Sequence, residues 1–216
     1  MEAKRSEIAG YILAGGKGRR MGGCQKLYLR WQGRYVACWT MDALDMLDVW
    51  YLSVAQIPEE PVGEAGWIRD LFPDLGPLGG ILSGLLLCPE KALFVVPCDL
   101  LGLDGEMAQK MMEEYHRTGR PVFLRTKEGV EPFPGIYTKE MIPVMERQRR
   151  EGNYRMKRLF ETDEAETYSF LDGTMQMKTL INLNTEAEYE RLQRRNDGSG
   201  EGNGKGGPGT HPESGR

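Results

Sequence analysis

The sequence has few residues of the kinds that build redox, zinc or histidine-based catalytic sites. Its 216 residues include only four cysteines and two histidines. No two cysteines form a Cys-x-x-Cys pair, so neither the common zinc motif nor a dithiol motif is indicated. His116 falls late in an expected helix, and His211 lies in a polar segment near the end. We therefore expect no histidine-activated nucleophile.

Long hydrophobic runs and an excess of positive charge are also lacking. The longest apolar stretches, residues 81–87 and 92–97, are too short to span a bilayer. The charged first residues are not followed by a secretory hydrophobic region. The net charge of −4 argues against general binding to nucleic acid or to a membrane. We expect a cytoplasmic protein with reduced thiols, in which any anion-binding site is local.

Glycine, by contrast, is abundant and concentrated near the start of the chain. An apolar run at residues 11–14 breaks at Gly15 and Gly16, and the basic residues Arg19, Arg20 and Lys26 follow. Glycines let backbone N–H groups approach a ligand closely, and successive N–H groups form a concave site for anions. The pattern predicts a strand that ends in a polyphosphate-binding loop over residues 14–25.

This loop does not match the two best-known phosphate motifs. Residues 18–24 lack the Lys-Ser/Thr end of a P-loop, and Met21 stands where the dinucleotide fingerprint requires glycine. On these residues alone, a glycine-rich surface turn with solvated basic side chains is the alternative interpretation.

The rest of the chain alternates between apolar runs and helical patterns. This alternation predicts an α/β fold in which a mostly parallel sheet is covered by helices on both faces. We expect residues 1–195 to form one domain, and the Gly-, Pro- and Ser-rich residues 196–216 to form a disordered tail. The expected strands are 8–13, 49–54, 67–68, 92–97, 121–124, 131–137, 167–170 and 180–183, and the expected helices are 36–47, 77–87, 105–118, 141–150, 155–160 and 186–195.

The strongest strand pattern, residues 92–97, is followed directly by Cys98 and Asp99. Ligands of open α/β sheets bind outside the carboxyl ends of the strands. If this strand lies near the first one, Asp99 faces the glycine-rich loop. A carboxylate there suits Mg²⁺ that is held jointly with substrate phosphates. A helix cap or a turn is the alternative role for an isolated Asp in this position.

The string from Leu13 to Gly23, followed by Lys26, resembles the Leu-Ala-Gly-Gly-x-x-x-Arg-Met-Gly…Lys signature of nucleotidyltransferases. Within that superfamily, the chain is most similar to the molybdenum cofactor guanylyltransferases over roughly residues 8–192. The resemblance implies a Rossmann-like, three-layer α/β/α nucleotidyltransferase fold. It also implies Mg²⁺-dependent transfer of GMP from GTP to the phosphate of molybdopterin, with release of pyrophosphate.

The resemblance also assigns roles to individual residues. The segment 94–99 resembles the family's Pro-Cys-Asp segment, which makes Asp99 the magnesium ligand and a catalytic residue. Lys26 and Arg19 are the candidates for countering the triphosphate charge, because guanidinium and ammonium groups bind phosphate oxygens. The residues that it assigns to nucleotide or acceptor binding are Leu13, Ala14, Gly15, Gly16, Lys26, Ser53, Asp70, Gly76, Gly79, Asn182 and Asn184.

The sequence departs from the family's pattern at three positions. Ser53 stands where an Asn is common, Gln25 stands where the guanylyl enzymes usually have Asp, and no Pro follows Thr185. These departures keep two alternatives open: CTP in place of GTP, or a different acceptor. A third alternative is a non-catalytic nucleotide-binding regulator or chaperone for a molybdoenzyme. Expected partners are GTP or CTP, molybdopterin, and possible molybdoenzymes and cofactor-synthesis proteins.

Overall fold

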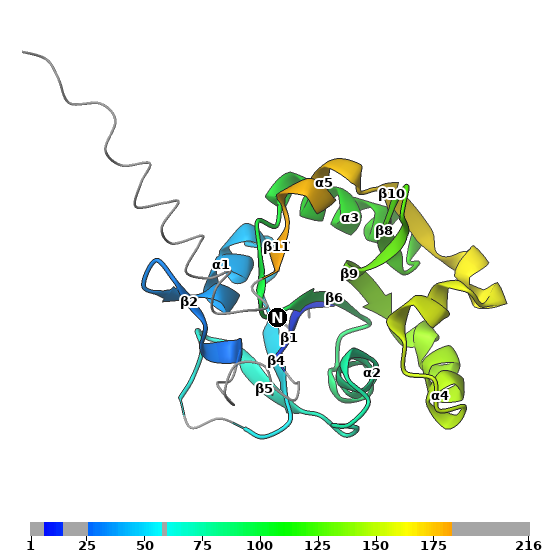
Figure 1. Ribbon diagram of the computed structural model, residues 1–216, viewed down its shortest axis with the longest axis horizontal. Helices are drawn as coiled ribbons and strands as arrows, with labels where there is room; N and C mark the ends of the chain where they lie inside the picture. Colours follow the sequence, from blue (N-terminus) through cyan, green and yellow to red (C-terminus); the bar gives the residue numbers. More distant parts are fainter. Residues whose placement is uncertain (1–6, 15–25, 58–59, 183–216) are drawn as a thin grey trace, which may run out of the picture.

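A seven-stranded sheet forms the centre of the molecule (Figure 1). The structure is a computed structural model that describes residues 7–14, 26–57 and 60–182. The strands follow the spatial order β10-β8-β9-β6-β1-β4-β5. Only β9 runs antiparallel to its neighbours, so the mostly parallel sheet expected from the sequence is confirmed. The strands are β1 (Ile8–Leu13), β4 (Trp50–Val54), β5 (Gly66–Arg69), β6 (Ala92–Pro97), β8 (Val122–Thr126), β9 (Gly129–Thr138) and β10 (Ser169–Asp172).

Strand β1 is central and buried on both faces, as its continuous apolar sequence predicts. It pairs in parallel with β6 on one side and with β4 on the other. Because side chains alternate along a strand, Ala9, Tyr11 and Leu13 join the core on one face of the sheet. Ile8 and Ile12 join the two hydrophobic clusters on the other face.

Helices cover both faces, which gives the expected three layers (Figure 1). The core under α2 and α4 contains Tyr11 and Leu13, and the core under α3 contains Ile8 and Phe94. The α-helices are α1 (Val36–Ala43), α2 (Pro77–Leu87), α3 (Gly105–Thr118), α4 (Ile142–Arg150) and α5 (Thr174–Thr179). The 3₁₀ helices are η1 (Lys26–Tyr28), η2 (Lys139–Met141), η3 (Met156–Phe160) and η4 (Asp163–Thr167). No helix in these described parts is long and apolar enough to cross a bilayer.

Local signals explain where the best-predicted helix begins and ends. The carboxylate of Asp104 accepts a hydrogen bond from the Glu106 N–H at 3.0 Å and so caps the start of α3. Gly119 has a φ of 66° and ends the helix in the left-handed conformation that glycine favours. The expected bounds of 105–118 are therefore confirmed.

Other boundaries differ from expectation. Helix α1 ends at Ala43 rather than at 47, because the backbone leaves the helical conformation at Leu44. Both Leu44 and Leu47 are nevertheless buried in the core. Their apolar spacing therefore reflects burial and does not mean that the helix extends to residue 47. Helix α5, the hairpin of β2 (Arg30–Trp31) with β3 (Arg34–Tyr35), and β7 (Leu100–Leu101) were not predicted. Strand β11 (Ile181–Asn182) lies within the expected strand 180–183, but its pairing with β7 was not predicted. The expected helix 186–195 and tail 196–216 lie outside the described residues.

Candidate active site at the carboxyl edge of the sheet

The ends of four parallel strands meet at one edge of the sheet. In the register of the sheet, Leu13 lies beside both Pro97 and Ser53, and Ser53 in turn lies beside Ile68. The residues that follow β1, β6 and β5 therefore emerge at the same edge. This is the edge at which open α/β sheets bind ligands.

Backbone hydrogen bonds continue past the strand ends and hold these segments together. The Ala14 N–H donates to the Ser53 carbonyl at 3.0 Å, and the Cys98 N–H donates to the Leu13 carbonyl at 3.1 Å. The Asp70 N–H donates to the Val54 carbonyl at 2.9 Å. The first residue of the glycine-rich loop is thus fixed between the segments that carry Ser53 and Asp99.

Ser53 and Asp70 form a short hydrogen bond at this edge, in which the Ser53 hydroxyl donates to Asp70 Oδ1. Ser53 is fully buried, whereas Asp70 is partly exposed. Burial raises the pKa of the Asp70 carboxyl above its ordinary value, and the bond from Ser53 opposes that rise. Asp70 therefore presents a carboxylate of fixed orientation whose charge is poorly solvated.

The first turn of α2 packs closely against this pair. A Cβ on Gly80 would lie 2.8 Å from Ser53 Oγ and 3.0 Å from Leu13 Cδ2, so only glycine fits there without a shift. The Tyr11 hydroxyl reaches across the sheet face and donates to the Gly80 carbonyl at 2.8 Å. Helix α2 is consequently held against the ends of β1, β4 and β5.

The turn that leads into α2 also depends on glycine. Gly76 has a φ of 59° at the N-cap position, a conformation that L side chains rarely adopt. A Cβ on Gly79 would collide with the Phe72 carbonyl oxygen. The Ser83 hydroxyl accepts a bond from the Leu71 N–H at 2.8 Å and donates to the Gly79 carbonyl at 2.6 Å. These contacts fix the segment between Asp70 and the helix.

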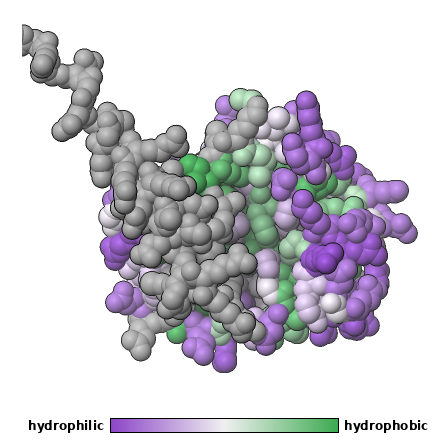
Figure 2. All heavy atoms as spheres, viewed as in Figure 1, coloured by the Kyte–Doolittle hydropathy of each residue, from purple (hydrophilic) through white to green (hydrophobic). Residues whose placement is uncertain are grey.

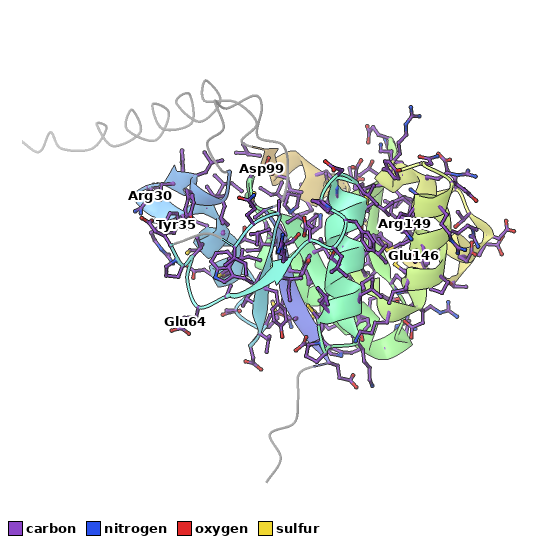
Figure 3. The ribbon with its side chains drawn as sticks, turned by 90° about the horizontal axis from the view of Figure 1, so that it is seen from below. Arg30, Tyr35, Glu64, Asp99, Glu146 and Arg149 are labelled. Atoms are coloured by element: carbon purple, nitrogen blue, oxygen red, sulfur yellow. The ribbon has the colours of Figure 1, made fainter. Side chains whose placement is uncertain are left out.

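Asp99 lies at the same edge, where Figure 3 labels it. It is 8% exposed and follows β6 by two residues. Its neighbour Cys98 belongs to a hydrophobic cluster that also contains Leu27, the residue after Lys26. The backbones of Lys26 and Asp99 therefore both lie next to this hydrophobic cluster, although η1 and β6 are far apart in the sequence.

A magnesium ion fits the chemistry of this edge. No cluster of three or more metal-ligating side chains occurs in residues 7–14, 26–57 and 60–182. Mg²⁺ is commonly held by one or two carboxylates together with substrate phosphates and waters, and Asp99 is the described residue here that would supply one such carboxylate. A dedicated cage made only of protein ligands is not needed.

The remaining predicted site residues fall into two groups. Asn182 lies in β11, where its backbone pairs with Leu100, the residue after Asp99. Gly15, Gly16, Arg19 and Asn184 lie outside the described residues.

Sequence reasoning missed several supporting contacts at this edge. Tyr11 and Gly80 were not singled out, and Ser53 was expected to contact nucleotide rather than Asp70. The hydroxyl of Tyr11 within a strand that is otherwise apolar was the signal available, because a buried tyrosine hydroxyl usually requires a hydrogen-bond partner.

The fold and this edge are those of a nucleotidyltransferase, an enzyme class that uses nucleoside triphosphates. The chain belongs to the family of MobA-like NTP transferase domains, whose model matches residues 10–167. It is 27% identical over 190 residues to the molybdenum cofactor guanylyltransferase of Desulfosudis oleivorans, covering 86% of this chain and 94% of that protein. It is 30% identical over 184 residues to the probable molybdenum cofactor guanylyltransferase of Carboxydothermus hydrogenoformans, covering 84% of this chain and 92% of that protein.

Solved structures share the fold at lower sequence identity. The molybdopterin-guanine dinucleotide biosynthesis protein A of Archaeoglobus fulgidus aligns with a TM-score of 0.67 and 17% identity, covering 88% of this chain and 99% of that one. The 2-C-methyl-D-erythritol 4-phosphate cytidylyltransferase of Thermus thermophilus aligns with a TM-score of 0.62 and 14% identity, covering 88% of this chain and 98% of that one. Both confirm the predicted nucleotidyltransferase fold.

Proposed function

We propose that the protein transfers GMP from GTP to the phosphate of molybdopterin and releases pyrophosphate. The observation that carries the proposal is the meeting of Ala14, Asp70 and Asp99 at one edge of the sheet, in a chain whose relatives are named as guanylyltransferases of this cofactor. The arrangement supports a proposal in which the segment after β1 binds the phosphates, Asp70 contacts the nucleoside and Asp99 binds the metal.

In this proposal the chain positions two phosphates for in-line reaction. The acceptor phosphate oxygen attacks the α-phosphorus of GTP, and the bond from that phosphorus to the β-phosphate oxygen breaks. Backbone N–H groups of residues 14–18, with Arg19 and Lys26, hold the leaving pyrophosphate. The acceptor is itself the nucleophile, so no Ser, Cys or His nucleophile is required, and catalysis rests on positioning and charge stabilisation.

Asp99 would hold Mg²⁺, and the ion would supply positive charge that stabilises the phosphates during transfer. Asn182 and Asn184 contact the acceptor. Asp70 contacts the nucleoside, with Ser53 acting through it, because the buried Ser53 hydroxyl is already directed to the Asp70 carboxylate.

The test is a thermal-shift comparison of the purified chain with GTP or CTP in the presence of Mg²⁺, followed by an assay of pyrophosphate release with molybdopterin. A ligand that binds the native state raises the melting temperature, and at equal concentration the ligand that binds more tightly gives the larger shift. We expect GTP to give the larger shift. A larger shift with CTP would overturn the guanylyl assignment, and metal-dependent binding without pyrophosphate release would overturn the proposed reaction.

A further inference from the structure

A side chain of α4 contacts the segment that joins Asp70 to α2. This segment, residues 71–76, follows Asp70 directly and leads into the first turn of α2. The guanidinium carbon of Arg149 lies 4.9 Å from the centre of the Phe72 ring, which is a cation–π contact. The two residues are far apart in the sequence, so this contact depends on the packing of α4 beside α2.

Arg149 is held in its orientation by a neighbour on the same helix. Its Nε and Nη2 atoms donate hydrogen bonds to Glu146 Oε2 at 3.1 and 2.8 Å (Figure 3). The Arg149 and Glu146 side chains are 33% and 26% exposed, so solvent screens this pair less than a pair on the surface. Figure 2 shows polar residues over the flank formed by α4, η3 and η4, and the neighbouring Arg150 is exposed. Arg149 therefore differs from Arg150 in being partly buried and fixed against Phe72.

Phe72 in turn is coupled to the start of α2. Its carbonyl accepts a hydrogen bond from the Leu75 N–H at 3.2 Å, and it lies so close to Gly79 that a Cβ there would collide with it. The Phe72 ring is partly buried against the core under α2. A displacement of Phe72 would therefore also move the turn that begins α2.

The rest of the segment buries little surface. Its exposed residues are Leu71, Pro73, Asp74 and Gly76. Within residues 71–76 only Phe72 and Leu75 are partly shielded from solvent. Segments with few buried contacts open locally at the lowest cost in free energy. Phe72, which contacts both α2 and Arg149, is therefore one of two shielded anchors of the segment.

We propose that Arg149 is a positioning residue for nucleotide binding. Its contact with Phe72 keeps residues 71–76 closed against α2, and the closed segment holds Asp70 in place for the nucleoside. Arg149 acts through Phe72 and touches no substrate. This inference rests on the proposed function, because it takes Asp70 as the residue that contacts the nucleoside. The contact can raise the affinity for the nucleotide only by as much as it favours the closed segment.

The test is a calorimetric titration of the full chain with GTP and Mg²⁺, well below the melting temperature, so that each variant is folded. We expect Arg149→Ala to weaken GTP binding about three- to tenfold, which matches the usual strength of a partly buried cation–π contact. Arg149→Lys keeps a charge near the ring but loses the planar fork that bonds Glu146, so its affinity should be intermediate. Arg150→Ala removes the same charge from an exposed neighbour and should bind GTP like the parent.

A double-mutant cycle separates positioning from a general loss of stability. Phe72→Leu removes the ring but keeps an apolar side chain against the core. If Arg149 acts through Phe72, Arg149→Ala should cause no further loss of affinity in the Phe72→Leu background. Amide hydrogen exchange of the nucleotide-free chain gives a second readout. The Leu75 N–H, which is bonded to the Phe72 carbonyl, should exchange faster in Arg149→Ala but not in Arg150→Ala.

The outcomes separate this inference from the proposed function. Equal GTP affinity of the parent and Arg149→Ala, an equal loss with and without the Phe72 ring, or unchanged exchange of the Leu75 N–H would overturn the role of Arg149 and leave the proposed function in place. Absence of GTP binding to the parent would overturn the proposed function, and the role of Arg149 with it. The parent titration alone therefore tells the two failures apart.

Discussion

The hydroxyl of Ser53 donates a hydrogen bond to the carboxylate of Asp70 across two neighbouring parallel strands. The donor is fully buried and the acceptor partly so. The pair therefore couples the ionisation of Asp70 to the stability of the sheet edge.

Replacing Asp70 with Asn should stabilise the protein at neutral pH. Burial raises the pKa of Asp70 in the native state above its unfolded value, so ionisation costs more in the folded protein. This cost is absent below the unfolded pKa of about 3.9, grows as the pH rises through the window up to the folded pKa, and is constant above it. Urea unfolding at pH 3 and pH 7 should show Asp70→Asn matching the parent at pH 3 and exceeding it at pH 7.

Ser53→Ala serves as the matched control for that experiment. The bond from Ser53 lowers the pKa of Asp70, so its removal should raise that pKa further and reduce stability at pH 7. A carboxyl NMR titration reads the shift directly. If Asp70→Asn were instead less stable than the parent at pH 7 alone, the ionised carboxylate would be the favoured native form and the argument would be wrong.

Gly80→Ala should destabilise the protein although alanine is the better helix former. The added Cβ would lie 2.8 Å from Ser53 Oγ and 3.0 Å from Leu13 Cδ2, so α2 must move away from the sheet. Overpacking of this kind costs about 1–3 kcal/mol, which exceeds the propensity gain of about 1 kcal/mol. Chemical denaturation measures the difference. Leu86→Ala, at a side chain 44% exposed on the same helix, should change stability much less.

Gln176→Leu should lower stability by about 2 kcal/mol or more. The Gln176 side chain is 2% exposed, accepts from the Asp104 N–H at 2.9 Å and donates to the Gly102 carbonyl at 3.1 Å. Leucine leaves both backbone groups without these bonds, and each such loss costs about 1–3 kcal/mol. The neighbouring exposed Met175→Leu is the control, with an expected change close to zero. Equal unfolding free energies for the parent and Gln176→Leu would contradict this account.

Asp99→Asn should abolish metal-dependent turnover while the fold survives. The amide keeps the shape of the buried side chain but removes the charge proposed to hold Mg²⁺ against the phosphates. Removal of one key electrostatic group typically costs about 10²-fold or more in rate. Pyrophosphate release and the Mg²⁺-dependent thermal shift with GTP are the measurements. Glu64→Gln removes an exposed carboxylate away from this edge and should leave both unchanged (Figure 3).

The sheet and its helices were largely predictable because their signals are local. The apolar run of β1 and the cap residues Asp104 and Gly119 each mark an element within a few residues. Short pairings carry no such signal. The β7–β11 pair joins Leu100 to Asn182, and neither dipeptide has a pattern that identifies its distant partner.

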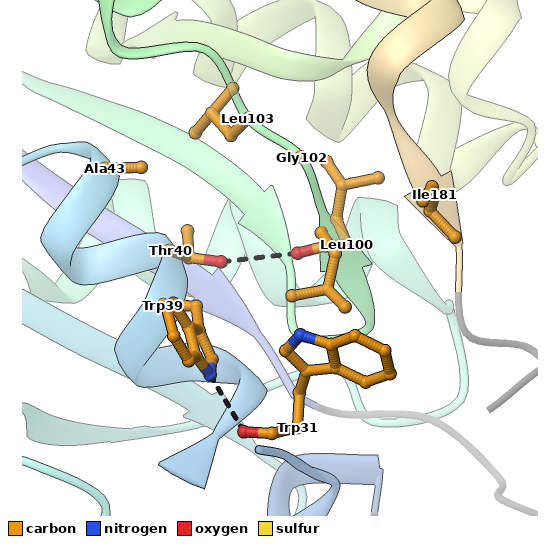
Figure 4. Close-up of a pocket in the computed structure, with 9 residues that line it drawn as sticks. Trp31, Trp39, Thr40, Ala43, Leu100, Gly102, Leu103 and Ile181 are labelled. Carbon is orange, nitrogen blue, oxygen red and sulfur yellow. Dashed lines mark hydrogen bonds between the residues drawn. The ribbon is translucent and has the colours of Figure 1, made fainter. Parts of the chain in front are cut away.

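The site was predictable in outline only. That Asp99 and the glycine-rich loop share an edge follows from strand polarity, which the alternating pattern already indicates. The Ser53–Asp70 bond and the close approach of Gly80 depend on how α2 packs, and no single residue encodes that packing. Trp31 and Trp39 lie in separate segments, and only the folded chain brings them together with β7 around one pocket (Figure 4).

The pairing of β7 with β11 has a consequence for synthesis on the ribosome. A nascent chain that has emerged through Asp172 already contains all seven strands of the main sheet, yet Leu100 and Leu101 still lack the strand that pairs with them. Only when Ile181 and Asn182 appear can this two-stranded sheet form. The segment that follows Asp99 is therefore completed during translation later than the sheet edge that carries Asp70.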